Sequence, residues 1–461
     1  MISLNLEKPK KIHFIGIGGV SMSGLAEILK RDGHTVTGSD AIASSATAHL
    51  EGKGIAISIP NAARNITGDM DLVVFTAAVK KDNPEYIAAA EKGIQLVERA
   101  ALIGVMLEKY SNSICIAGTH GKTTATSLIS EITLDAGLAP TIQIGGYLGR
   151  DGTNYHVGNS SYFVLESCEY NNSFHHFKPH IGVILNIEAD HLEFFGDLNG
   201  VIASFKKFAN NIRPGGVLII QEGIPGFDDV VADLDCEVVT FGERYGDFWV
   251  RNVKYDGMGR PTFNIMSEKT KLANVSLPLP GDYNMLNALA SFAVGFELGI
   301  EPDDIAHSLS CAKGVKRRFE LKGTYNNAHI IDDYAHHPTE ILKLLQAARK
   351  AVNEKGGRLF CLFQPHTFSR TKNLMDSFSN AFGDAHHVGL VPIFPSREAF
   401  DPSVSSLHLL EGIKANNISS NHFENFETAR DYYVQKLLPG DMLITTGAGD
   451  VFIVGEMVLS T

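Results

Sequence analysis

Residues 118–124 constrain the fold of this chain more than any other segment. They read Gly118-Thr119-His120-Gly121-Lys122-Thr123-Thr124, and they lie between a largely apolar run at 113–117 and a helical pattern at 125–132. A strand, a glycine-rich loop, a lysine, a hydroxyl and a helix in this order predict a phosphate-binding loop. The spacing departs from G-x-x-x-x-G-K-[ST], because Ile116 stands where the first glycine would be. A glycine-rich turn with a solvent-facing lysine is therefore the alternative.

The chemistry of such a loop assigns a role to each residue type. Glycines let backbone N–H groups turn toward phosphate oxygens, and the helix N-terminus adds partial positive charge. Lys122 would neutralise the terminal phosphates of a nucleotide, and the Thr123 hydroxyl would ligate Mg²⁺.

Composition limits the class of protein. The chain has 461 residues, which predicts two to four domains, and its 44 glycines suit an α/β protein with many tight turns. The net charge of −12 and the absence of a long Lys/Arg run argue against nucleic-acid or membrane-surface partners. The N-terminus lacks the basic-then-apolar design of a signal peptide, and no apolar run reaches membrane-spanning length. The five scattered cysteines indicate reduced core residues of a cytoplasmic protein.

Alternating strand and helix patterns divide the chain into three predicted domains. We expect an α/β fold with a Rossmann-like N-terminal domain at 1–110, a central P-loop ATPase-like domain at 111–316 and a Rossmann-like C-terminal domain at 317–461. The strands that support this division are expected at 12–15, 34–37, 71–75, 162–165, 181–185, 330–333, 358–363 and 442–445. Helices are expected at 22–30, 86–92 and 340–352, and a small β insertion within 238–275.

A second glycine-rich turn follows the first predicted strand. Gly16-Ile17-Gly18-Gly19-Val20-Ser21, with Asp40 closing the next strand, nearly matches the dinucleotide fingerprint G-x-G-x-x-G. Ser21 replaces the third glycine. A nucleotide of some kind is expected here, while an NAD(P) site and a turn that only packs helix on strand stay open as alternatives.

Polar residues follow several other predicted strands. Glu166 ends one buried strand, and the segment 186–191 (Asn-Ile-Glu-Ala-Asp-His) follows the next. Ligands of open α/β sheets bind beyond the carboxyl ends of the strands, so Glu166 is a candidate Mg²⁺ ligand and 186–191 a candidate functional segment. A helix-capping Asp190 with a surface His191 is the alternative. Similar clusters at 332–338 and 363–370 are expected to face one site, although each alone could be a solvated loop.

Taken in order, these motifs resemble the Mur ligase family over essentially the whole chain. The motifs that carry the resemblance are 16–19, 118–124, Glu166, 186–191, 284–288, 317–319, 332–340 and 364–370. The family's shortened loop, G-T-H-G-K-T-T, accounts for the unusual spacing before Gly121.

The resemblance implies an ATP- and Mg²⁺-dependent ligase of peptidoglycan synthesis. Its motif order is most similar to the members that phosphorylate the lactyl carboxylate of UDP-N-acetylmuramate and join the resulting acyl phosphate to L-alanine. It implies no nucleic-acid or membrane partner, and a monomer or homodimer. Three rivals stay open: a recycling ligase that adds an intact tripeptide, a nucleotide-binding sensor without turnover, and an NAD-dependent oxidoreductase.

The resemblance also implies roles for individual residues. The ATP site would comprise Gly118, Thr119, His120, Gly121, Lys122, Thr123, Thr124, Asn284, Asn287, Arg318 and Asp333. The catalytic residues would be Lys122, Glu166, His191 and Arg318, with Thr123, Glu166 and His191 as metal ligands. The UDP-sugar would lie on Gly16, Gly18, Gly19, Ser21, Ser39 and Asp40, and the amino acid on Tyr334, His336, His366 and Arg370.

Three positions depart from the family pattern. Ser21 stands at a usual glycine, the stretch at 167–172 carries fewer carboxylates than usual, and Thr367 replaces an arginine often found after the pocket histidine. The last departure bears on amino-acid affinity and leaves the ATP chemistry untouched.

Overall fold

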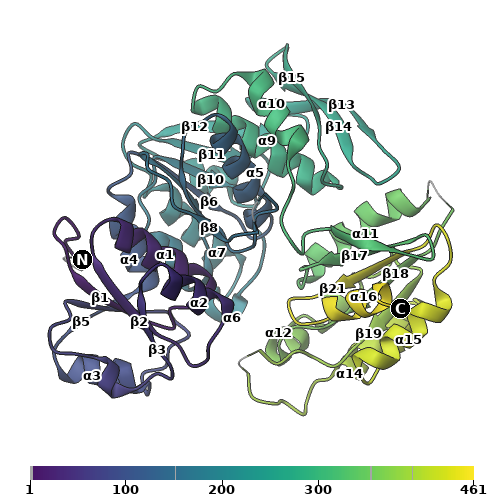
Figure 1. The fold of residues 1–461 in the computed structure, drawn as a ribbon. Helices are drawn as coiled ribbons and strands as arrows, with labels where there is room; N and C mark the ends of the chain where they lie inside the picture. The colour runs from purple at the N-terminus through teal and green to yellow at the C-terminus, as the bar shows by residue number, and fades with distance from the viewer. Residues whose placement is uncertain (1–3, 151, 354–355, 397) are drawn as a thin grey trace. The chain divides into compact units, whose positions relative to one another are not determined.

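The computed structural model describes residues 4–150, 152–353, 356–396 and 398–461, which contain three β-sheets with helices packed on them (Figure 1). The chain divides into two compact units. The first unit comprises Met1–Trp249, Met266–Thr270 and Leu289–Ser308, and the second comprises Val250–Ile265, Lys271–Ala288 and Leu309–Thr461.

The N-terminal sheet is parallel, with strand order β3-β2-β1-β4-β5. Residues of β1 alternate between two apolar clusters, since Ile12 and Phe14 pack with α1 and α4 while Ile15 packs with α3 on the other face. The elements are β1 (Lys11–Ile15), α1 (Val20–Arg31), β2 (Thr35–Ser39), α2 (Ser45–Gly52), β3 (Ala56–Ser58), η1 (Ala63–Asn65), β4 (Leu72–Phe75), α3 (Pro84–Glu91), β5 (Gln95–Glu98) and α4 (Arg99–Leu107).

The central sheet has the order β15-β14-β13-β12-β11-β10-β6-β9-β7-β8. Strands β12, β11, β10, β6, β9 and β7 are mutually parallel, so their carboxyl ends share one edge. Its strands are β6 (Asn112–Ala117), β7 (Thr141–Gln143), β8 (Tyr155–His156), β9 (Tyr162–Glu166), β10 (Ile181–Ile184), β11 (Val217–Gln221), β12 (Glu237–Gly242), β13 (Phe248–Tyr255), β14 (Pro261–Ser267) and β15 (Thr270–Ser276). Its helices are α5 (Lys122–Asp135), η2 (Tyr170–His176), α6 (Leu192–Phe195), α7 (Leu198–Ala209), α8 (Phe227–Val231), α9 (Asp282–Glu297) and α10 (Pro302–Cys311).

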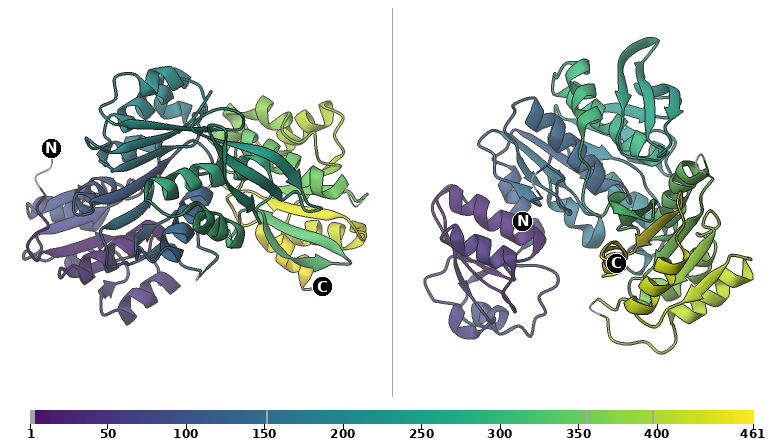
Figure 2. Two further views of the ribbon diagram at one scale, coloured as in Figure 1. Left: turned by 90° about the horizontal axis from the view of Figure 1, so that it is seen from above. Right: turned by 45° about the vertical axis from the view of Figure 1, so that its right-hand side comes forward.

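The C-terminal sheet has the order β16-β17-β21-β18-β19-β20, with only the β16–β17 pair antiparallel. Separate apolar clusters cover its two faces, and Figure 2 shows helices on both sides of this green-to-yellow part of the chain. The elements are β16 (Glu320–Tyr325), β17 (Ala328–Asp333), α11 (Pro338–Asn353), β18 (Leu359–Phe363), α12 (Phe368–Asn373), α13 (Met375–Ser379), β19 (His387–Leu390), α14 (Ser406–Ala415), β20 (Ser420–His422), α15 (Phe426–Lys436), β21 (Met442–Thr446) and α16 (Phe452–Leu459).

One apolar cluster joins the N-terminal and central sheets within the first unit. It runs from β1 through Leu102 and Met106 of α4 to Phe174 of η2 and Phe205 of α7. Gly104 of α4 allows this packing, because a Cβ there would lie 2.3 Å from the His176 carbonyl oxygen. The two glycine-rich turns of the first unit therefore stand on one continuous core.

Most predicted elements are confirmed within one or two residues of their ends, and the β insertion corresponds to β12–β15. The predicted boundaries at 110 and 316 remain a prediction, because the two compact units divide the chain at other positions. The expectation of core cysteines holds for Cys115 and Cys361, which are buried, and is wrong for Cys168 and Cys311, which are exposed. Among the described residues, no helix is long and apolar enough to cross a bilayer.

Candidate active site

The phosphate loop has the predicted strand–loop–helix geometry. It leaves β6 and enters α5 through Gly121, whose φ of 82° lies in the left-handed region that favours glycine. Gly118 is equally constrained, because its φ is 148° and a Cβ added there would lie 3.0 Å from the Leu185 Cβ. No side chain caps α5, so the first N–H groups of this 14-residue helix are available to an anion.

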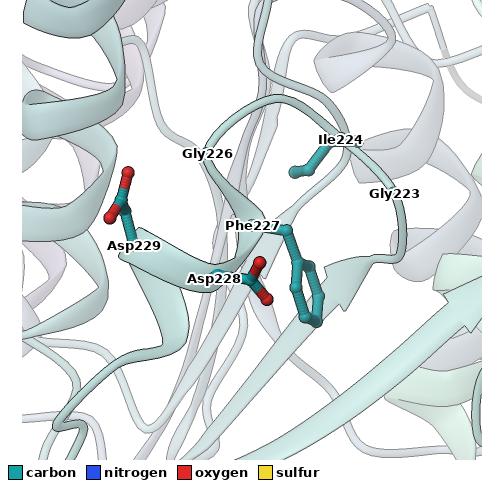
Figure 3. Close-up of a pocket in the computed structure, with 6 residues that line it drawn as sticks. All are labelled: Gly223, Ile224, Gly226, Phe227, Asp228 and Asp229. Atoms are coloured by element: carbon teal, nitrogen blue, oxygen red, sulfur yellow. The ribbon is translucent and has the colours of Figure 1, made fainter.

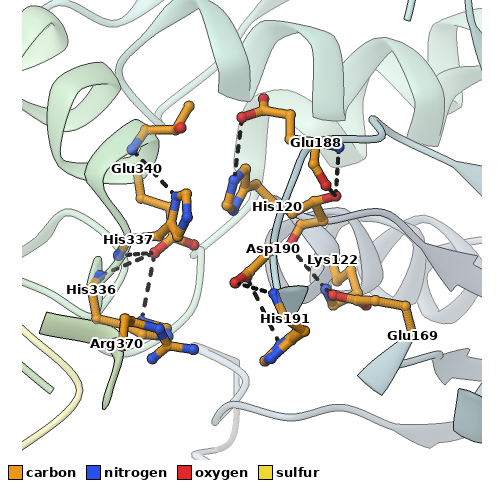
Figure 4. A network of polar contacts seen from close by, with 12 residues as sticks. His120, Lys122, Glu169, Glu188, Asp190, His191, His336, His337, Glu340 and Arg370 are labelled. Carbon is orange, nitrogen blue, oxygen red and sulfur yellow. Dashed lines mark hydrogen bonds and ion pairs between the residues drawn. The ribbon is translucent and has the colours of Figure 1, made fainter. Parts of the chain in front are cut away.

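Lys122 points back over the loop rather than into solvent (Figure 4). Its Nζ donates to the Gly118 and Thr119 carbonyl oxygens at 2.5 and 3.0 Å, and lies 2.8 Å from Glu169 Oε2. Burial alone would lower the pKa of Lys122, but the Glu169 carboxylate raises it above the usual value. The lysine is therefore fully charged, and the alternative of a solvent-facing lysine is wrong. Glu169 was missed as a site residue; its position three residues after Glu166 was the available signal.

Thr123 and Glu166 lie together as predicted for metal ligands. The Thr123 hydroxyl donates to Glu166 Oε1 at 2.9 Å, and the Gly145 N–H donates to Oε2 at 2.7 Å. A hydroxyl and a carboxylate are the hard oxygen donors that Mg²⁺ accepts in nucleotide sites, where phosphates and water complete its coordination. These two residues therefore fit Mg²⁺. In the part of the chain that the structure describes, no group of three His, Cys, Asp or Glu side chains could hold a metal by itself.

The segment 186–191, which follows β10, hydrogen-bonds to the phosphate loop. The Asn186 side chain accepts from the His120 N–H at 2.8 Å and donates to its carbonyl at 3.0 Å. The Glu188 N–H donates to the Thr119 hydroxyl at 2.9 Å. Asn186 and Glu188 thus lie against the phosphate loop, while a functional role for 186–191 stays a prediction.

His191 contacts Tyr170 and Asp190 rather than the Thr123–Glu166 pair. Its backbone has φ of 52°, its ring lies 4.6 Å from the Tyr170 ring, and its Nε2 is 3.8 Å from Asp190 Oδ2 (Figure 4). A role for His191 at a second metal stays a prediction.

In the N-terminal glycine turn, residues predicted for the UDP-sugar site hydrogen-bond to one another. The Gly16 N–H donates to the Ser39 carbonyl at 2.8 Å, and the Gly18 N–H to Asp40 Oδ2 at 2.9 Å. Gly19 is the N-cap of α1, which carries no side-chain cap. Ser21, in the first turn of α1, accepts from Arg99 Nη1 at 2.8 Å and from Gln143 Nε2 at 2.6 Å. The serine in place of a glycine thus makes contacts that a glycine could not.

A buried carboxylate beneath this turn was not found from the sequence. Glu85 of α3 is fully buried and accepts from Asn65 Nδ2 at 2.6 Å, from the Ala62 N–H at 3.1 Å and from the Ser39 hydroxyl. Burial would raise the pKa of Glu85, but the nearby His13 ring, with Nε2 at 3.5 Å, and the hydrogen bonds that the carboxylate accepts lower it to about 2. Ser39, predicted to bind the UDP-sugar, is therefore held by a permanently ionised partner.

In the second unit, Arg318 stands between two residues with left-handed backbone, Arg317 at φ 61° and Phe319 at φ 48°. Asp333 fixes this turn, since its two carboxylate oxygens accept from the Phe319 and Ala335 N–H groups at 2.7 Å each. Burial raises the pKa of Asp333 to about 6, against the lowering effect of Arg318. Backbone strain of this kind concentrates at functional sites.

The predicted amino-acid residues form a cluster in the second unit. The His336 and His366 ring centroids are 5.7 Å apart, and Arg370 Nη1 donates to His366 Nδ1 at 3.3 Å. His336 Nδ1 donates to the Tyr334 carbonyl at 3.0 Å, which leaves Nε2 as an acceptor. Burial lowers the pKa of both histidines to about 4, so both rings are neutral near pH 7.

Thr367 adopts an unusual backbone, with φ of 65° and ψ of 146°, and caps α12 by accepting from the Arg370 N–H at 3.4 Å. A β-branched residue with positive φ is a strained choice. The residue that departs from the family pattern thus fixes the start of the helix that carries Arg370.

The two predicted adenine-site asparagines are buried at the start of α9. Asn284 Nδ2 donates to the Pro280 carbonyl at 2.8 Å, and Asn287 Nδ2 to Asn284 Oδ1 at 3.3 Å. Their contact with a nucleotide stays a prediction.

A separate hollow of about 470 Å³ lies after β11 (Figure 3). Phe227 and Asp228 are next to each other, whereas Asp229 points away from them. The lining residues are Gly223, Ile224, Gly226, Phe227, Asp228 and Asp229. Since the charged members of this set are carboxylates, the hollow is unsuited to phosphate and is not part of the candidate site.

Three regions of the chain match parts of one enzyme family. Residues 11–111 match the Mur ligase family catalytic domain, 116–295 the Mur ligase middle domain, and 317–449 the Mur ligase glutamate ligase domain. The chain belongs to the Mur ligase family. The resemblance stated from the motifs is thereby confirmed.

Relatives in this family match the chain from end to end. The UDP-N-acetylmuramate–L-alanine ligase of Lachnospira eligens is 44% identical over 461 residues, covering 100% of both chains. The enzyme of the same name from Clostridium novyi is 46% identical over 450 residues, covering 98% of this chain and 97% of its own.

Solved structures agree on the architecture. UDP-N-acetylmuramate-alanine ligase from Thermotoga maritima aligns with a TM-score of 0.81 at 27% identity, covering 98% of each chain. A murein peptide ligase from Psychrobacter arcticus aligns with a TM-score of 0.71 at 24% identity, covering 98% of each chain. This similarity supports the fold alone. The predicted three-part α/β Mur ligase architecture is confirmed.

Proposed function

We propose that this protein is an ATP-dependent ligase that joins the lactyl carboxylate of UDP-N-acetylmuramate to the amine of L-alanine, in peptidoglycan precursor synthesis. The full-length similarity to ligases of that name carries the proposal. The charged phosphate loop of the first unit and the neutral histidine cluster of the second supply the groups that this reaction needs.

The reaction has two steps. A carboxylate is a poor electrophile, so one of its oxygens first attacks the γ-phosphorus of ATP, and ADP leaves. The alanine amine then attacks the acyl carbon, and phosphate leaves with the carboxylate oxygen that bonded to phosphorus. Little covalent chemistry falls to the protein, and positioning with charge stabilisation provides the catalysis.

The residues of the phosphate loop carry the first step. Lys122 and the N–H groups at the start of α5 would bind the β- and γ-phosphates and stabilise the charge that develops on them. Thr123 and Glu166 would hold Mg²⁺, which supplies charge neutralisation at the phosphates. Arg318 and Asp333, in the second unit, remain predicted contacts of the nucleotide.

The histidine cluster serves the second step. Arg370 would bind the carboxylate of the amino acid, as guanidinium groups commonly do. The free Nε2 of His336 is an acceptor for a proton of the attacking amine. Tyr334 and His366 would complete the pocket around the small side chain.

Free cysteines at all five positions support a cytoplasmic enzyme, where its ATP would also be found. A monomer or homodimer is the expected assembly.

The deciding experiment measures phosphate release with ATP, Mg²⁺ and UDP-N-acetylmuramate, with L-alanine or the tripeptide L-alanyl-γ-D-glutamyl-diaminopimelate added separately. Release that depends on L-alanine, together with the mass of the alanylated nucleotide, is the expected result. Release only with the tripeptide would assign a recycling ligase instead. No release with either would contradict the proposal and favour a sensor, and a nicotinamide fluorescence change on mixing with NADH would favour an oxidoreductase.

A further inference from the structure

Arg317 precedes Arg318 and is held by groups from three elements of the second unit. Its Nε donates to Asp332 Oδ2, near the end of β17, at 2.9 Å, and its Nη2 donates to the Gly447 carbonyl, directly after β21, at 2.7 Å. Its guanidinium carbon also lies 4.6 Å from the centroid of the Phe452 ring, at the start of α16. Arg317 therefore ties the carboxyl ends of two strands to a helix.

The ion pair between Arg317 and Asp332 is shielded from solvent. The Asp332 side chain is 1% exposed and that of Arg317 is 23% exposed. The second carboxylate oxygen, Oδ1, accepts from the Thr445 hydroxyl at 2.9 Å. Burial raises the pKa of Asp332, against the lowering effect of Arg317. A shielded charge pair whose carboxylate oxygens are both hydrogen-bonded is costly to break, so it holds the guanidinium in one orientation.

The Tyr334 ring connects Arg317 to Arg318. The two guanidinium carbons lie 5.1 and 5.3 Å from the centroid of this ring, within the range of cation–π attraction. The Tyr334 N–H also donates to the Arg317 carbonyl at 2.7 Å. Across the described parts of the chain, the Arg318 guanidinium forms no ion pair, so its N–H groups stay available to a phosphate while the ring orients it.

The backbone at Arg317 also needs support. Its φ of 61° lies in the left-handed region, which is unfavourable for a residue with a Cβ, and the φ of Phe319 is 48°. The Arg317 N–H donates to Glu320 Oε2 at 2.8 Å. The side-chain anchors of Arg317 therefore stabilise a strained turn whose middle residue is Arg318.

We propose that Arg317 is a positioning residue, which holds the Arg318 guanidinium and the Tyr334 ring in the geometry that the reaction requires. This rests on the proposed function, which gives Arg318 to the nucleotide and Tyr334 to the amino acid. Arg317 itself touches neither substrate. One anchor thus supports predicted contacts of both ATP and L-alanine.

Arg358 forms the same kind of anchor at the other end of the C-terminal sheet. It lies directly before β18, and its Nη2 donates to Asp441 Oδ2 at 2.6 Å and to the Lys436 carbonyl at 2.7 Å. Its guanidinium carbon lies 4.9 Å from the centroid of the Phe360 ring. Because it lies at the amino end of the strands, away from the predicted contacts, Arg358 is a matched control for Arg317.

Steady-state kinetics of phosphate release by the full-length protein, with each substrate varied in turn, test the proposal. Arg317→Met keeps the length of the side chain and removes its donors. We expect kcat/KM for ATP and for L-alanine to fall about 10- to 100-fold, with both KM values raised, since a shift of about 1 Å in a positioned group can cost about 100-fold. The KM for UDP-N-acetylmuramate should be unchanged, because its predicted residues lie in the first unit.

Arg358→Met separates positioning from stability. It should lower the denaturant midpoint of unfolding about as much as Arg317→Met does, and leave the KM of every substrate at the wild-type value. A protein that is merely less stable loses active fraction, which lowers kcat and leaves the KM values unchanged.

Asp332→Asn tests the same anchor with almost no change in side-chain size. Thr445 can still donate to the amide oxygen, while the charge that holds Arg317 is lost. This variant should reproduce the kinetic pattern of Arg317→Met, and Asp441→Asn should not.

A double variant shows whether Arg317 acts through Arg318. In an Arg318→Met background, Arg317→Met should cause little further loss in kcat/KM for ATP, because the group that it positions is already absent. Losses that multiply would show that the two arginines act independently and would overturn the proposal.

Wild-type KM values for ATP and L-alanine in both Arg317→Met and Asp332→Asn would also overturn the positioning role. The proposed function would then still stand, provided that the wild-type protein releases phosphate in an L-alanine-dependent way. If the wild-type protein releases no phosphate with L-alanine, the proposed function and the role of Arg317 both fail.

Discussion

The phosphate loop contains a charged ion pair, whereas the histidine cluster contains neutral imidazole rings. In the first, Lys122 and Glu169 are both charged and lie 2.8 Å apart. In the second, burial drives His336 and His366 toward neutrality, with pKa values of about 4. Phosphoryl transfer needs fixed charges that stabilise the transferred phosphate. An attacking amine instead needs an unprotonated acceptor for its proton. The same chain thus builds one region on ion pairing and the other on desolvation.

Removing the charge of the phosphate loop should have the largest effect. Lys122→Ala should lower the rate of ligation by about 1,000-fold or more, because the lysine stabilises charge that develops on the transferred phosphoryl group. Coupled assay of ADP formation measures it. Lys269→Ala, which removes an exposed lysine of the β14–β15 turn, should retain full activity. Turnover near the wild-type rate in Lys122→Ala would remove the loop from the mechanism.

Weakening the metal ligand should have the next largest effect. Glu166→Gln keeps the size of the side chain and removes a charge from the oxygen pair formed with Thr123. We expect the Mg²⁺ concentration for half-maximal activity to rise about tenfold. Glu222→Gln, directly after β11 at the same edge of the central sheet, is the control. Superimposable Mg²⁺ titrations for wild type and Glu166→Gln would argue against a metal role.

The strength of the Lys122–Glu169 ion pair can be measured through the free energy of unfolding. Glu169→Gln removes the buried counter-ion of Lys122, whose side chain is only 14% exposed, so the free energy of unfolding should fall by about 2–4 kcal/mol. In the double variant Lys122→Met/Glu169→Gln much of this loss should be recovered, because no unpaired charge remains. A double-mutant cycle from denaturant unfolding gives the coupling. Additive losses would show that the pair is not coupled in the way its geometry indicates.

The smallest effect concerns the neutral histidines. The pKa of His366 is about 4 in the folded protein and near 6.5 in an unfolded chain, so its contribution to stability is complete above pH 6.5 and is lost as pH falls toward 4. His366→Gln removes this dependence. Between pH 7 and pH 5, the wild-type Tm should therefore fall by about 2–4 °C more than that of the variant. Parallel Tm curves would show that the histidine is not held neutral.

The sequence predicted the two regions unequally, for physical reasons. Local patterns located the phosphate loop, because strand, glycines, lysine and helix are contiguous and their geometry follows from a few backbone angles. Glu169 and Asn186 were not assigned roles, since their contacts to Lys122 and His120 depend on strands brought together by the sheet. Ser21 was predicted as a UDP-sugar residue at a usual glycine position, but its hydrogen bonds to Arg99 and Gln143, 78 and 122 residues away, were not predicted. The neutrality of His336 and His366 depends on burial, which no spacing of residues reveals.

The most direct test of the account follows an oxygen atom. UDP-N-acetylmuramate labelled with ¹⁸O in its lactyl carboxylate is turned over with ATP, Mg²⁺ and L-alanine, and the released phosphate is analysed by mass. An acyl phosphate intermediate requires one carboxylate oxygen to leave with each phosphate, so every phosphate from doubly labelled substrate should carry one ¹⁸O. Unlabelled phosphate, released in step with the alanylated product, would contradict activation of the carboxylate at the phosphate loop.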